Sequence, residues 1–377
     1  MNHERILLLF EHRENRHLLA TWLAASYVAV EGDSAEALNQ PFDLCIVDGV
    51  MLGRLLDAIR ARKQSEHEVL LPVLLAFSRH EVGSGLRRIW EVVDEFISVP
   101  IEKSELAARV EMLLRARRFS RQNFELRRAL ETELAHAAQV QAALLPQGSP
   151  SLEGFELAAG CLPAREVGGD FYDWEEISPG ILSFTLGDVC GKGMSAALLT
   201  ATIRATLRAV SRQNGPAEAL RLAHHALADD FERSGRFVTL FHGRLEVAKR
   251  QLLYADAGHG LVFLRRAEGR IEALQPGGMP LGAFADQEYP ENTLDLRSGD
   301  TLLIFSDGLT ESHQDEIAQP SVLAERLDQT RSATEMVERL LEIPRRMATL
   351  ADDVTVMVLR CCDDHLADRR TASSPSP

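Results

Sequence analysis

Four aspartates lie beside small or turn-forming residues, at points where we expect a strand to end and the chain to turn. They occur in Gly168-Gly169-Asp170, Gly187-Asp188-Val189, Ser306-Asp307-Gly308 and Ala351-Asp352-Asp353. Carboxylates brought close together repel and raise one another's pKa unless a cation neutralises them. A convergent acidic cluster therefore predicts a bound hard cation, and oxygen-only ligands favour Mg²⁺ or Mn²⁺ over zinc.

Taken singly, each of these sites has an ordinary explanation. Asp-Gly is common turn chemistry, so Asp307-Gly308 alone would indicate a loop. The metal hypothesis depends on four aspartates occurring in order along the chain. No set of His and Cys residues with zinc spacing competes with them in the sequence.

The elements around these aspartates predict an α+β layered domain. It would begin after the breaker-rich stretch Pro146–Ser151. Strands that gather around two central helices, rather than alternating with them, are typical of this class. The expected strands are 181–186, 237–247, 251–255, 301–305 and 354–359, and the expected helices lie near 192–212, 216–232 and 332–349.

Residues 1–102 follow a different pattern, in which short apolar runs alternate with segments of helical period. The expected strands are 6–10, 44–47, 69–77 and 96–99, and the expected helices lie near 16–25, 51–63 and 83–92. Such alternation predicts a doubly wound α/β domain with a parallel sheet.

A linker joins the two patterns. From Lys103 to Leu145 there is no Pro or Gly, so one long helix is expected, ending before Pro146. A 4-3-4-3 spacing of Leu, Ala and Gln runs for about two heptads, which leaves a homodimer through the linker helix and a single helix both open. These positions are Leu130, Leu134, Ala137, Gln141 and Leu144.

Charge and composition exclude several classes of partner. Acidic residues outnumber basic ones, 56 to 41, giving a formal net charge of −15. A field of this sign repels nucleic acid and anionic lipid, so binding to nucleic acid or membrane is not expected. A basic cluster on the linker predicts a solvated helix face in preference to a phosphate-binding patch. It consists of Arg115, Arg117, Arg118 and Arg121.

The cellular compartment that we expect follows from hydropathy and cysteine usage. The longest apolar stretch, Leu70–Phe77, falls well short of the roughly 18 residues that a membrane span needs. Five cysteines form no pairing pattern. We therefore expect a cytoplasmic protein with reduced thiols.

The order of the acidic sites and their neighbours resembles the PPM family of metal-dependent serine/threonine protein phosphatases (type 2C-like), in particular its bacterial stress-response and sporulation branch. The matching stretches are 163–173, 187–197, 257–259, 280–282, 301–311 and 352–356, with 134–146 resembling the lead-in helix of that branch. The chain departs from the branch at Gly260-Leu261-Val262, where Asn-Pro-Pro is usual, and at 317–320. Neither departure touches a metal ligand, so both concern substrate fit.

The resemblance implies a β-sandwich flanked by helices that holds two Mn²⁺ or Mg²⁺ ions. Asp188 would bridge the ions, helped by the Val189 carbonyl, with Asp170 on one side and Asp307 and Asp352 on the other. Two such ions activate water for in-line attack on phosphorus, so catalysis would need no protein nucleophile.

Further residues have weaker expected roles. Asp173 and Asp353 are candidates for hydrogen-bonding the waters of the metals, and the sequence leaves open whether Asp352 or Asp353 is the direct ligand. Arg165 is a candidate clamp for the substrate phosphate, with a surface ion pair as the alternative.

Three features near the acidic sites have structural explanations that we prefer to catalytic ones. Gly191 and Gly193 are expected to shape the turn into the following helix. Lys192 is expected to be solvated. We expect His259 to be a packed histidine, hydrogen-bonded to backbone, rather than a general acid.

Residues 1–118 resemble a response-regulator receiver of two-component signalling. Asp48 ends the expected strand 44–47 and takes the place of the phosphoacceptor, and Val99-Pro100 resembles the last-loop Lys-Pro, with a candidate cis peptide. The acidic Mg²⁺ pair, however, becomes Phe10-Glu11, and the Lys becomes Val99. Phosphoryl transfer to Asp48 would then lack most of its charge stabilisation. We expect a degenerate receiver that signals by binding an upstream partner or by dimerisation.

These inferences divide the chain into a receiver-like domain (1–118), a helical linker (119–146), a phosphatase domain (147–362) and a disordered tail (363–377). The expected function is dephosphorylation of a phosphoserine anti-sigma-factor antagonist under control of the receiver-like domain. The alternative is a non-catalytic adaptor for a sigma factor or anti-sigma factor, although such adaptors tend to lose metal aspartates and all four are present here. A nucleotide cyclase built on Gly-Gly-Asp would fit only one of the four motifs.

Overall fold

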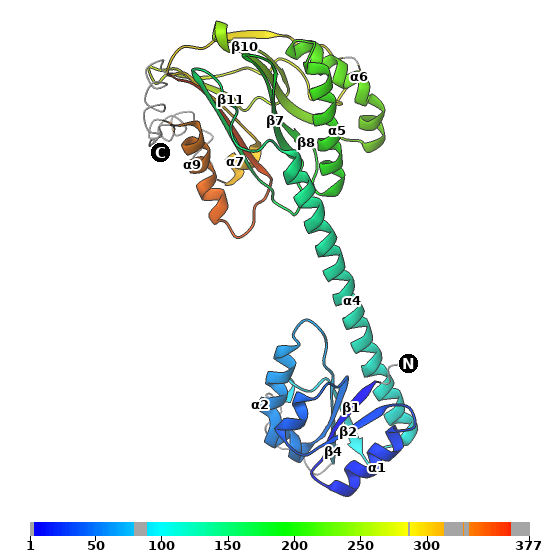
Figure 1. Ribbon diagram of the computed structural model, residues 1–377. Helices are drawn as coiled ribbons and strands as arrows, with labels where there is room; N and C mark the ends of the chain where they lie inside the picture. Colours follow the sequence, from blue (N-terminus) through cyan, green and yellow to red (C-terminus); the bar gives the residue numbers. More distant parts are fainter. Residues whose placement is uncertain (1–3, 79–88, 286, 313–326, 328–331, 363–377) are drawn as a thin grey trace, which may run out of the picture. The chain divides into compact units, whose positions relative to one another are not determined.

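A computed structural model describes residues 4–78, 89–285, 287–312, 327 and 332–362. The chain divides into two compact units, Met1–Thr132 and Glu133–Pro377 (Figure 1). The division falls within one continuous helix, so the expected domain limits at 118 and 147 stay predictions. The expected tail at 363–377 and the departure at 317–320 lie outside the described residues.

The first unit is built on a five-stranded parallel sheet in the order β2-β1-β3-β4-β5. This is the order of flavodoxin-like doubly wound sheets, which confirms the predicted α/β class. The strands are β1 (Arg5–Leu9), β2 (Val28–Gly32), β3 (Leu44–Asp48), β4 (Val73–Ser78) and β5 (Glu95–Val99). The helices are α1 (Arg13–Leu23), the 3-10 helix η1 (Ala35–Asn39), α2 (Gly49–Ser65) and the start of α4 (Lys103–Leu144). Most of the helix expected near 83–92 lies outside the described residues.

Both faces of this sheet are covered, which explains why its strands are continuous apolar runs. On one face, Leu7 and Val47 pack against Leu52 of α2. On the other face, Leu8 packs with a cluster that includes Val110 of α4. The first turns of α4 are thus part of the core of the first unit. The peptide bond between Val99 and Pro100 is cis, as the resemblance suggested.

The second unit contains two five-stranded antiparallel sheets, in the orders β13-β10-β9-β8-β7 and β12-β11-β14-β15-β6. The strands are β6 (Phe155–Leu162), β7 (Asp170–Ser178), β8 (Ile181–Val189), β9 (Val238–Glu246), β10 (Gln251–Ala257), β11 (Val262–Arg265), β12 (Ile271–Ala273), β13 (Asn292–Asp295), β14 (Thr301–Phe305) and β15 (Val354–Cys361). The helices are α5 (Met194–Ser211), α6 (Pro216–Ser234), the 3-10 helix η2 (Val247–Lys249), α7 (Asp307–Ser312) and α9 (Ala333–Arg346).

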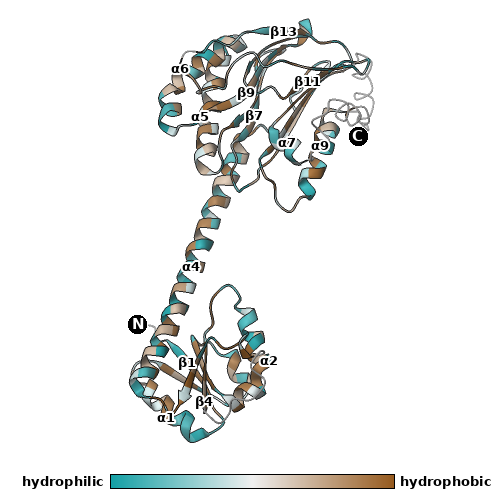
Figure 2. Cartoon of the chain, turned by 180° about the vertical axis from the view of Figure 1, so that it is seen from behind, coloured by the Kyte–Doolittle hydropathy of each residue, from teal (hydrophilic) through white to brown (hydrophobic). Residues whose placement is uncertain are grey.

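The two sheets face each other across one apolar core, in which Phe184 of one sheet and Leu302 and Met357 of the other are fully buried. Helices α5 and α6 pack on the outer face of the first sheet, and α7 and α9 on that of the second. The hydropathy colouring places the apolar residues of the strands inside these layers (Figure 2). This arrangement confirms the α+β sandwich flanked by helices.

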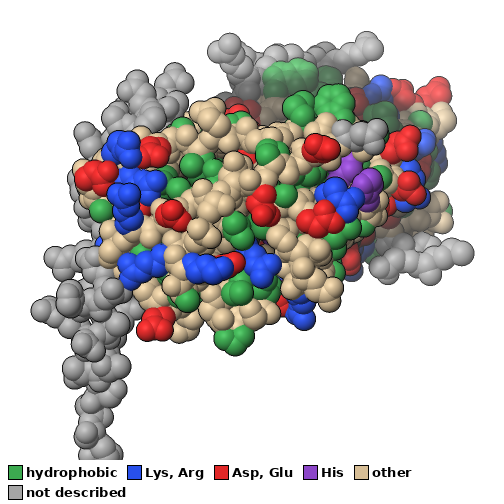
Figure 3. Space-filling model, turned by 90° about the horizontal axis from the view of Figure 1, so that it is seen from above, with side chains coloured by type: hydrophobic (Ala, Val, Ile, Leu, Met, Phe, Trp, Pro, Cys, Tyr) green, Lys and Arg blue, Asp and Glu red, His purple; other side chains and the backbone are tan. Residues whose placement is uncertain are grey.

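Charges on the second unit are mixed rather than segregated on the face drawn in Figure 3, where acidic and basic side chains are interspersed. Within the described ranges, no helix combines the length and the apolar character that a bilayer crossing requires. No disulfide joins cysteines within the part of the chain that the structure describes.

A buried histidine makes the stability of the second unit dependent on pH. His242 lies between the hydroxyls of Thr185 (2.7 Å) and Ser211 (2.9 Å), and burial lowers its pKa to about 4. As pH falls from 6.5 to about 4, His242 binds a proton in the unfolded chain but stays neutral in the folded chain. Stability should therefore fall in this window, by about 3 kcal/mol at its lower end from this one residue.

Denaturant unfolding across this pH window measures the effect. The His242→Gln variant should be less stable than wild type at neutral pH but should lose less stability on acidification. Equal acid losses in the two proteins would contradict the assignment.

Candidate metal centre

The antiparallel strands bring the four predicted aspartates to one end of the sandwich. Asp170 begins β7 and is the direct cross-strand partner of Asp188, near the end of β8. Asp307 follows β14, and Asp352 precedes its neighbour β15. The expectation that all four follow a strand was wrong for Asp170 and Asp352, which come before one. In an antiparallel pair, one strand ends where its neighbour begins, so both kinds of position reach the same edge.

The carboxylate of Asp353 ties the two sheets together at this edge. It accepts hydrogen bonds from the backbone N–H groups of Ala164 (2.7 Å), Gly169 (2.7 Å) and Asp170 (3.4 Å). A Cβ on Gly168 would lie 2.4 Å from the Asp353 Oδ2 atom, so only glycine fits there. The loop that carries Asp170 is therefore held against the start of β15 by one buried carboxylate.

Electrostatics show that the aspartates act on one another. Burial, and then the charges of Asp307 and Asp352, together raise the pKa of Asp188 to about 6. Burial and then the charge of Asp188 raise the pKa of Asp170. Desolvation and then Asp352 raise the pKa of Asp307. Such mutual repulsion is what a bound divalent cation relieves.

The donor set fits a hard cation. The Asp170 Oδ2 atom is buried and accepts no hydrogen bond within the described part of the chain. Asp188 is half-buried and Asp307 is exposed, so the cluster is open to solvent. Among the described residues, no three Asp, Glu, His or Cys side chains lie close enough together to hold a metal ion as they stand. The centre is thus an open group of carboxylates rather than a finished cage.

Lys192 is the cation that the structure places at this cluster. Its Nζ atom lies 2.9 Å from the Asp352 Oδ2 atom and also donates to the Ala351 carbonyl. Lys192 is nevertheless exposed, as predicted, with 37% of its side-chain surface open to solvent, and the turn before α5 directs it toward the start of β15. The hydrogen bond that Lys192 donates to Asp352 is the largest of the contributions that raise the pKa of Lys192.

The neighbouring aspartates 352 and 353 have different surroundings. Asp353 is buried and directs both oxygens at backbone N–H groups. Asp352 is half-buried and interacts with Lys192, Asp188 and Asp307. Asp352 therefore faces the other aspartates of the cluster, and Asp353 holds the loop.

Comparison with known proteins finds a family match that covers three of the four aspartates, Asp188, Asp307 and Asp352. Residues 178–361 match the family described as Stage II sporulation protein E (SpoIIE). Residues 178–361 therefore form a SpoIIE-type phosphatase domain.

Relatives of the SpoIIE-type domain occur in several bacteria. The chain is 28% identical over 245 residues to phosphoserine phosphatase RsbU of Bacillus subtilis, covering 62% of this chain and 72% of RsbU. It is 28% identical over 207 residues to protein IcfG of a Synechocystis strain, covering 48% of this chain and only 33% of IcfG. The SiaA-PP2C domain of Pseudomonas aeruginosa has the same fold, with a TM-score of 0.52 at 21% identity, covering 62% of this chain and 98% of that domain.

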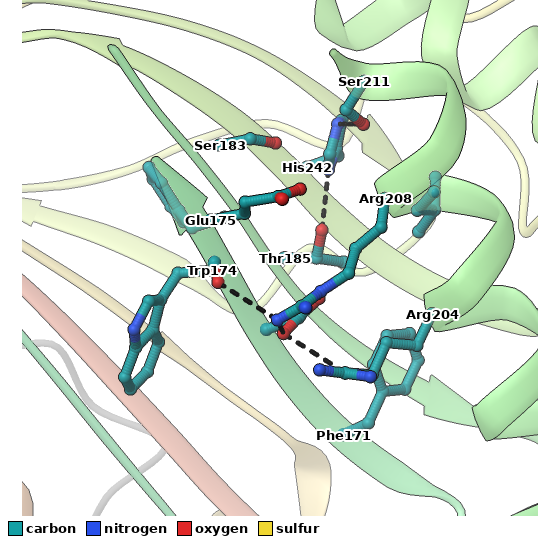
Figure 4. A pocket seen from close by; sticks show the side chains of 12 residues that line it. Phe171, Trp174, Glu175, Ser183, Thr185, Arg204, Arg208, Ser211 and His242 are labelled. Carbon is teal, nitrogen blue, oxygen red and sulfur yellow. Dashed lines mark hydrogen bonds and ion pairs between the residues drawn. The ribbon is translucent and has the colours of Figure 1, made fainter. Parts of the chain in front are cut away.

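Two other expected site residues, Arg165 and Asp173, precede the matched residues 178–361. Arg165 is exposed, with no ion pair to any described residue. Asp173 lies on the α5 side of β7, 3.2 Å from the Nε atom of Arg204, and Arg208 donates to both its oxygens. These arginines reach from α5 toward the sheet beside a cavity of about 10 Å³, which holds about one water (Figure 4). Asp173 therefore fixes α5 to the sheet in this structure.

The structural explanations for the neighbouring motifs are confirmed for the glycines and the histidine. Gly191 and Gly193 have φ angles of 101° and 82°, which favour glycine, in the turn that leads into α5. His259 is buried, which lowers its pKa to about 4, and it contacts the Phe305 backbone.

One residue at the centre was predicted only as a position of the 4-3-4-3 spacing on the linker helix. Gln141, near the end of α4, donates to the Gly168 carbonyl (2.8 Å) and accepts from the Gly168 N–H (3.1 Å). These two hydrogen bonds hold the loop in place two residues before Asp170. An isolated glutamine on an otherwise polar helix carries no signal for such a contact, beyond its place in the lead-in helix that the family resemblance marks.

Proposed function

We propose that the SpoIIE-type domain removes phosphate from phosphoserine in a protein, using two Mg²⁺ or Mn²⁺ ions. The observation that carries this proposal is the convergence of Asp170, Asp188, Asp307 and Asp352 at one open edge, with the pKa of Asp188 raised to about 6. Bound ions of this kind supply an activated water and stabilise charge on phosphoryl oxygens.

The chain's own residues would hold the ions and keep the edge in shape. Asp188 is adjacent to the other carboxylates and would be shared between the ions, assisted by the Val189 carbonyl. Asp353 and Gln141 hold the loop that carries Asp170. Exposure of Asp307 leaves room for the phosphorylated segment of a macromolecule to approach.

The proposed substrate is a phosphorylated protein of the anti-sigma-factor antagonist type. Two relatives, RsbU and RsbP of Bacillus subtilis, are named phosphoserine phosphatases, which supports phosphoserine as the target. The chain spans less than half of RsbP and about a third of IcfG. The proposals for its own activity and partners are therefore based on the metal centre described above.

The test is phosphate release from a phosphoserine protein. We expect release with Mn²⁺ or Mg²⁺, none after chelation, and recovery on adding the metal back. A phosphotyrosine protein should be a much poorer substrate. Release that continues in full after chelation would refute the two-ion proposal.

We further propose that the first unit regulates the phosphatase as a receiver-like domain through α4. Asp48 ends β3 and caps α2, and its carboxylate accepts from the N–H groups of Met51 (2.8 Å) and Glu11 (2.7 Å). The nearby Glu11 pairs with Arg54. These contacts suit a helix-capping aspartate and support signalling by an upstream binding partner rather than by phosphorylation of Asp48.

Gln141 provides the point at which α4 would act on the centre. The Gln141→Ala variant should lose both hydrogen bonds to Gly168 and loosen the Asp170 loop. We expect phosphatase activity to fall about tenfold, with a higher metal requirement. Gln139→Ala, an exposed change two residues away, is the matched control and should keep wild-type activity. Equal activities of the two variants would remove α4 from the proposed regulation.

We also propose that α4 pairs with α4 of a second copy. Large apolar side chains at seven-residue spacing, Met112, Phe119 and Leu126, are exposed, as are Leu130 and Val140 further along. Exposed residues at heptad spacing are typical of a coiled-coil seam. Leu126→Glu should convert a dimer into a monomer in light-scattering measurements, and a wild-type chain that is already monomeric at high concentration would contradict the pairing.

A further inference from the structure

The first unit contains a cavity of about 660 Å³ at the edge where β1 and β3 begin. Arg5, the first residue of β1, and Asp43, just before β3, both line it. Asp48 lies at the other end of β3. Ligands of open α/β sheets usually bind at the carboxyl ends of the strands, so this cavity is separate from the expected receiver site.

The charge of this cavity is opposite to that of the chain. Its lining contains five arginines and three carboxylates, an excess of two positive charges in a protein of net charge −15. The arginines are Arg5, Arg62, Arg117, Arg118 and Arg121, and the carboxylates are Glu4, Asp43 and Glu66. The sequence predicted a solvated basic face on α4, whereas three of those arginines line this cavity. A concave site with this excess concentrates a dianion.

Not all of these arginines are already committed. The Arg117 guanidinium already donates hydrogen bonds to the carboxylates of Asp43 (3.2 Å) and Glu66 (3.1 Å) and to the Leu70 carbonyl (2.8 Å). Arg5, in contrast, makes no side-chain ion pair with any residue that the structure describes, and its buried Nε atom has no acceptor. Arg121 has only an exposed pair with Glu125 (3.1 Å) one turn along the helix, which is weak. Arg5 and Arg121 are therefore the donors available to an incoming anion.

Arg62 offers a planar group in the same lining. Its guanidinium pairs with Glu66 and donates to the Ser65 hydroxyl (3.3 Å), which holds its plane in place, and its carbon lies 5.7 Å from the centre of the Phe42 ring. A guanidinium plane held in this way stacks on aromatic rings, including nucleobases. The volume also exceeds what a phosphate ion needs and falls within the range of sites for small organic ligands.

We propose that this cavity binds a nucleotide, with Arg5 and Arg121 holding its phosphate and Arg62 facing its base. Three of the five arginines belong to α4. A bound nucleotide would therefore contact both this helix and the sheet. Its binding would allow a small molecule to regulate the first unit.

Calorimetric titration of the full chain in the presence of a chelator tests the proposal. The probes are AMP, ADP, adenosine and inorganic phosphate. We expect AMP and ADP to bind, and adenosine and phosphate to bind at least about tenfold more weakly, because each lacks one of the two recognised groups. Affinity for AMP should decrease as salt is raised.

Matched arginine variants locate the site. Arg121→Gln removes an exposed side chain, so it should fold normally, and it should weaken AMP binding about tenfold. Arg127→Gln breaks the same kind of pair, with Glu131, on the same helix but outside the cavity, and should bind AMP as wild type does. Arg5→Gln is a second variant from a different element and should act like Arg121→Gln.

Several outcomes would overturn the assignment. These are no nucleotide binding at millimolar concentration, equal affinities for AMP and inorganic phosphate, or AMP affinities unchanged in both Arg121→Gln and Arg5→Gln. Repeating the titration on an Asp188→Asn chain excludes binding at the metal centre. Because no turnover is measured, failure here leaves the proposed phosphatase function untouched, and failure of that function leaves this site untouched.

Discussion

Replacing Asp188 by asparagine should abolish metal-dependent phosphate release. Asp188 is the carboxylate on which the charges of Asp307 and Asp352 converge, so it is the one that both ions would share. Loss of the ion-binding charge removes several kcal/mol of transition-state stabilisation, which corresponds to a decrease of about 10³-fold in rate. Phosphate release from a phosphoserine protein at saturating Mn²⁺ measures the effect.

The same variant should be at least as stable as wild type without metal. The pKa of Asp188 is raised from 3.8 to about 6 in the folded protein. An acid of this kind destabilises the folded state increasingly as pH rises from 3.8 through about 6, because the folded chain holds the proton more tightly. Asparagine cannot ionise, so metal-free Asp188→Asn should unfold at equal or higher denaturant concentration at neutral pH.

Two further variants complete this experiment. Asp307→Asn should also lose activity, whereas Asp229→Asn, an exposed change on α6, should keep it. If both centre variants release phosphate as fast as wild type, the non-catalytic adaptor becomes the better explanation.

Alanine at Asp353 should cost far more stability than alanine at Asp352. Asp353→Ala leaves the buried N–H groups of Ala164, Gly169 and Asp170 without their acceptor. Each hydrogen bond to a charged group contributes about 1.5–3 kcal/mol, so the two short bonds, from Ala164 and Gly169, predict a total loss of about 3–6 kcal/mol. Activity should also fall by about 10²-fold or more, because the Asp170 loop is misplaced.

Asp352→Ala is the natural control, since it changes the adjacent residue. It removes an ion pair with Lys192 that is partly open to solvent, so stability should change little. Activity should nevertheless be lost, and excess Mn²⁺ should restore little of it. If Asp353→Ala unfolds at the same denaturant concentration as wild type, the role of Asp353 as the holder of the loop is wrong.

Much of the fold could be predicted because burial leaves a plain pattern in the sequence. Strands such as β1, β3 and β15 are apolar almost throughout, and α4 lacks any residue that would break a helix. Strand β7 was not predicted, since its charged residues 170, 173, 175 and 176 conceal the alternation. Its pairing with β8 and its place at the sheet edge come from tertiary contacts.

Some residues of the candidate site could likewise be predicted from the sequence, and others could not. The four aspartates could be identified because acidic residues beside small residues such as glycine or alanine have few structural explanations when four of them occur in order. The hydrogen bonds of Asp353 and Gln141 could not be predicted, because each joins residues far apart in the chain and depends on atomic position. The ion pair between Lys192 and Asp352 likewise depends on two turns meeting in space.

The division of labour between residues 352 and 353 has an evolutionary consequence. A descendant that lost only Asp352 would keep its loop, its sheets and the surface that a partner recognises, while turnover ceased. Such a pseudoenzyme would stand one substitution away from the catalyst, and it could still compete for the same partner. A change at Asp353 opens no comparable route, because it would weaken the architecture itself.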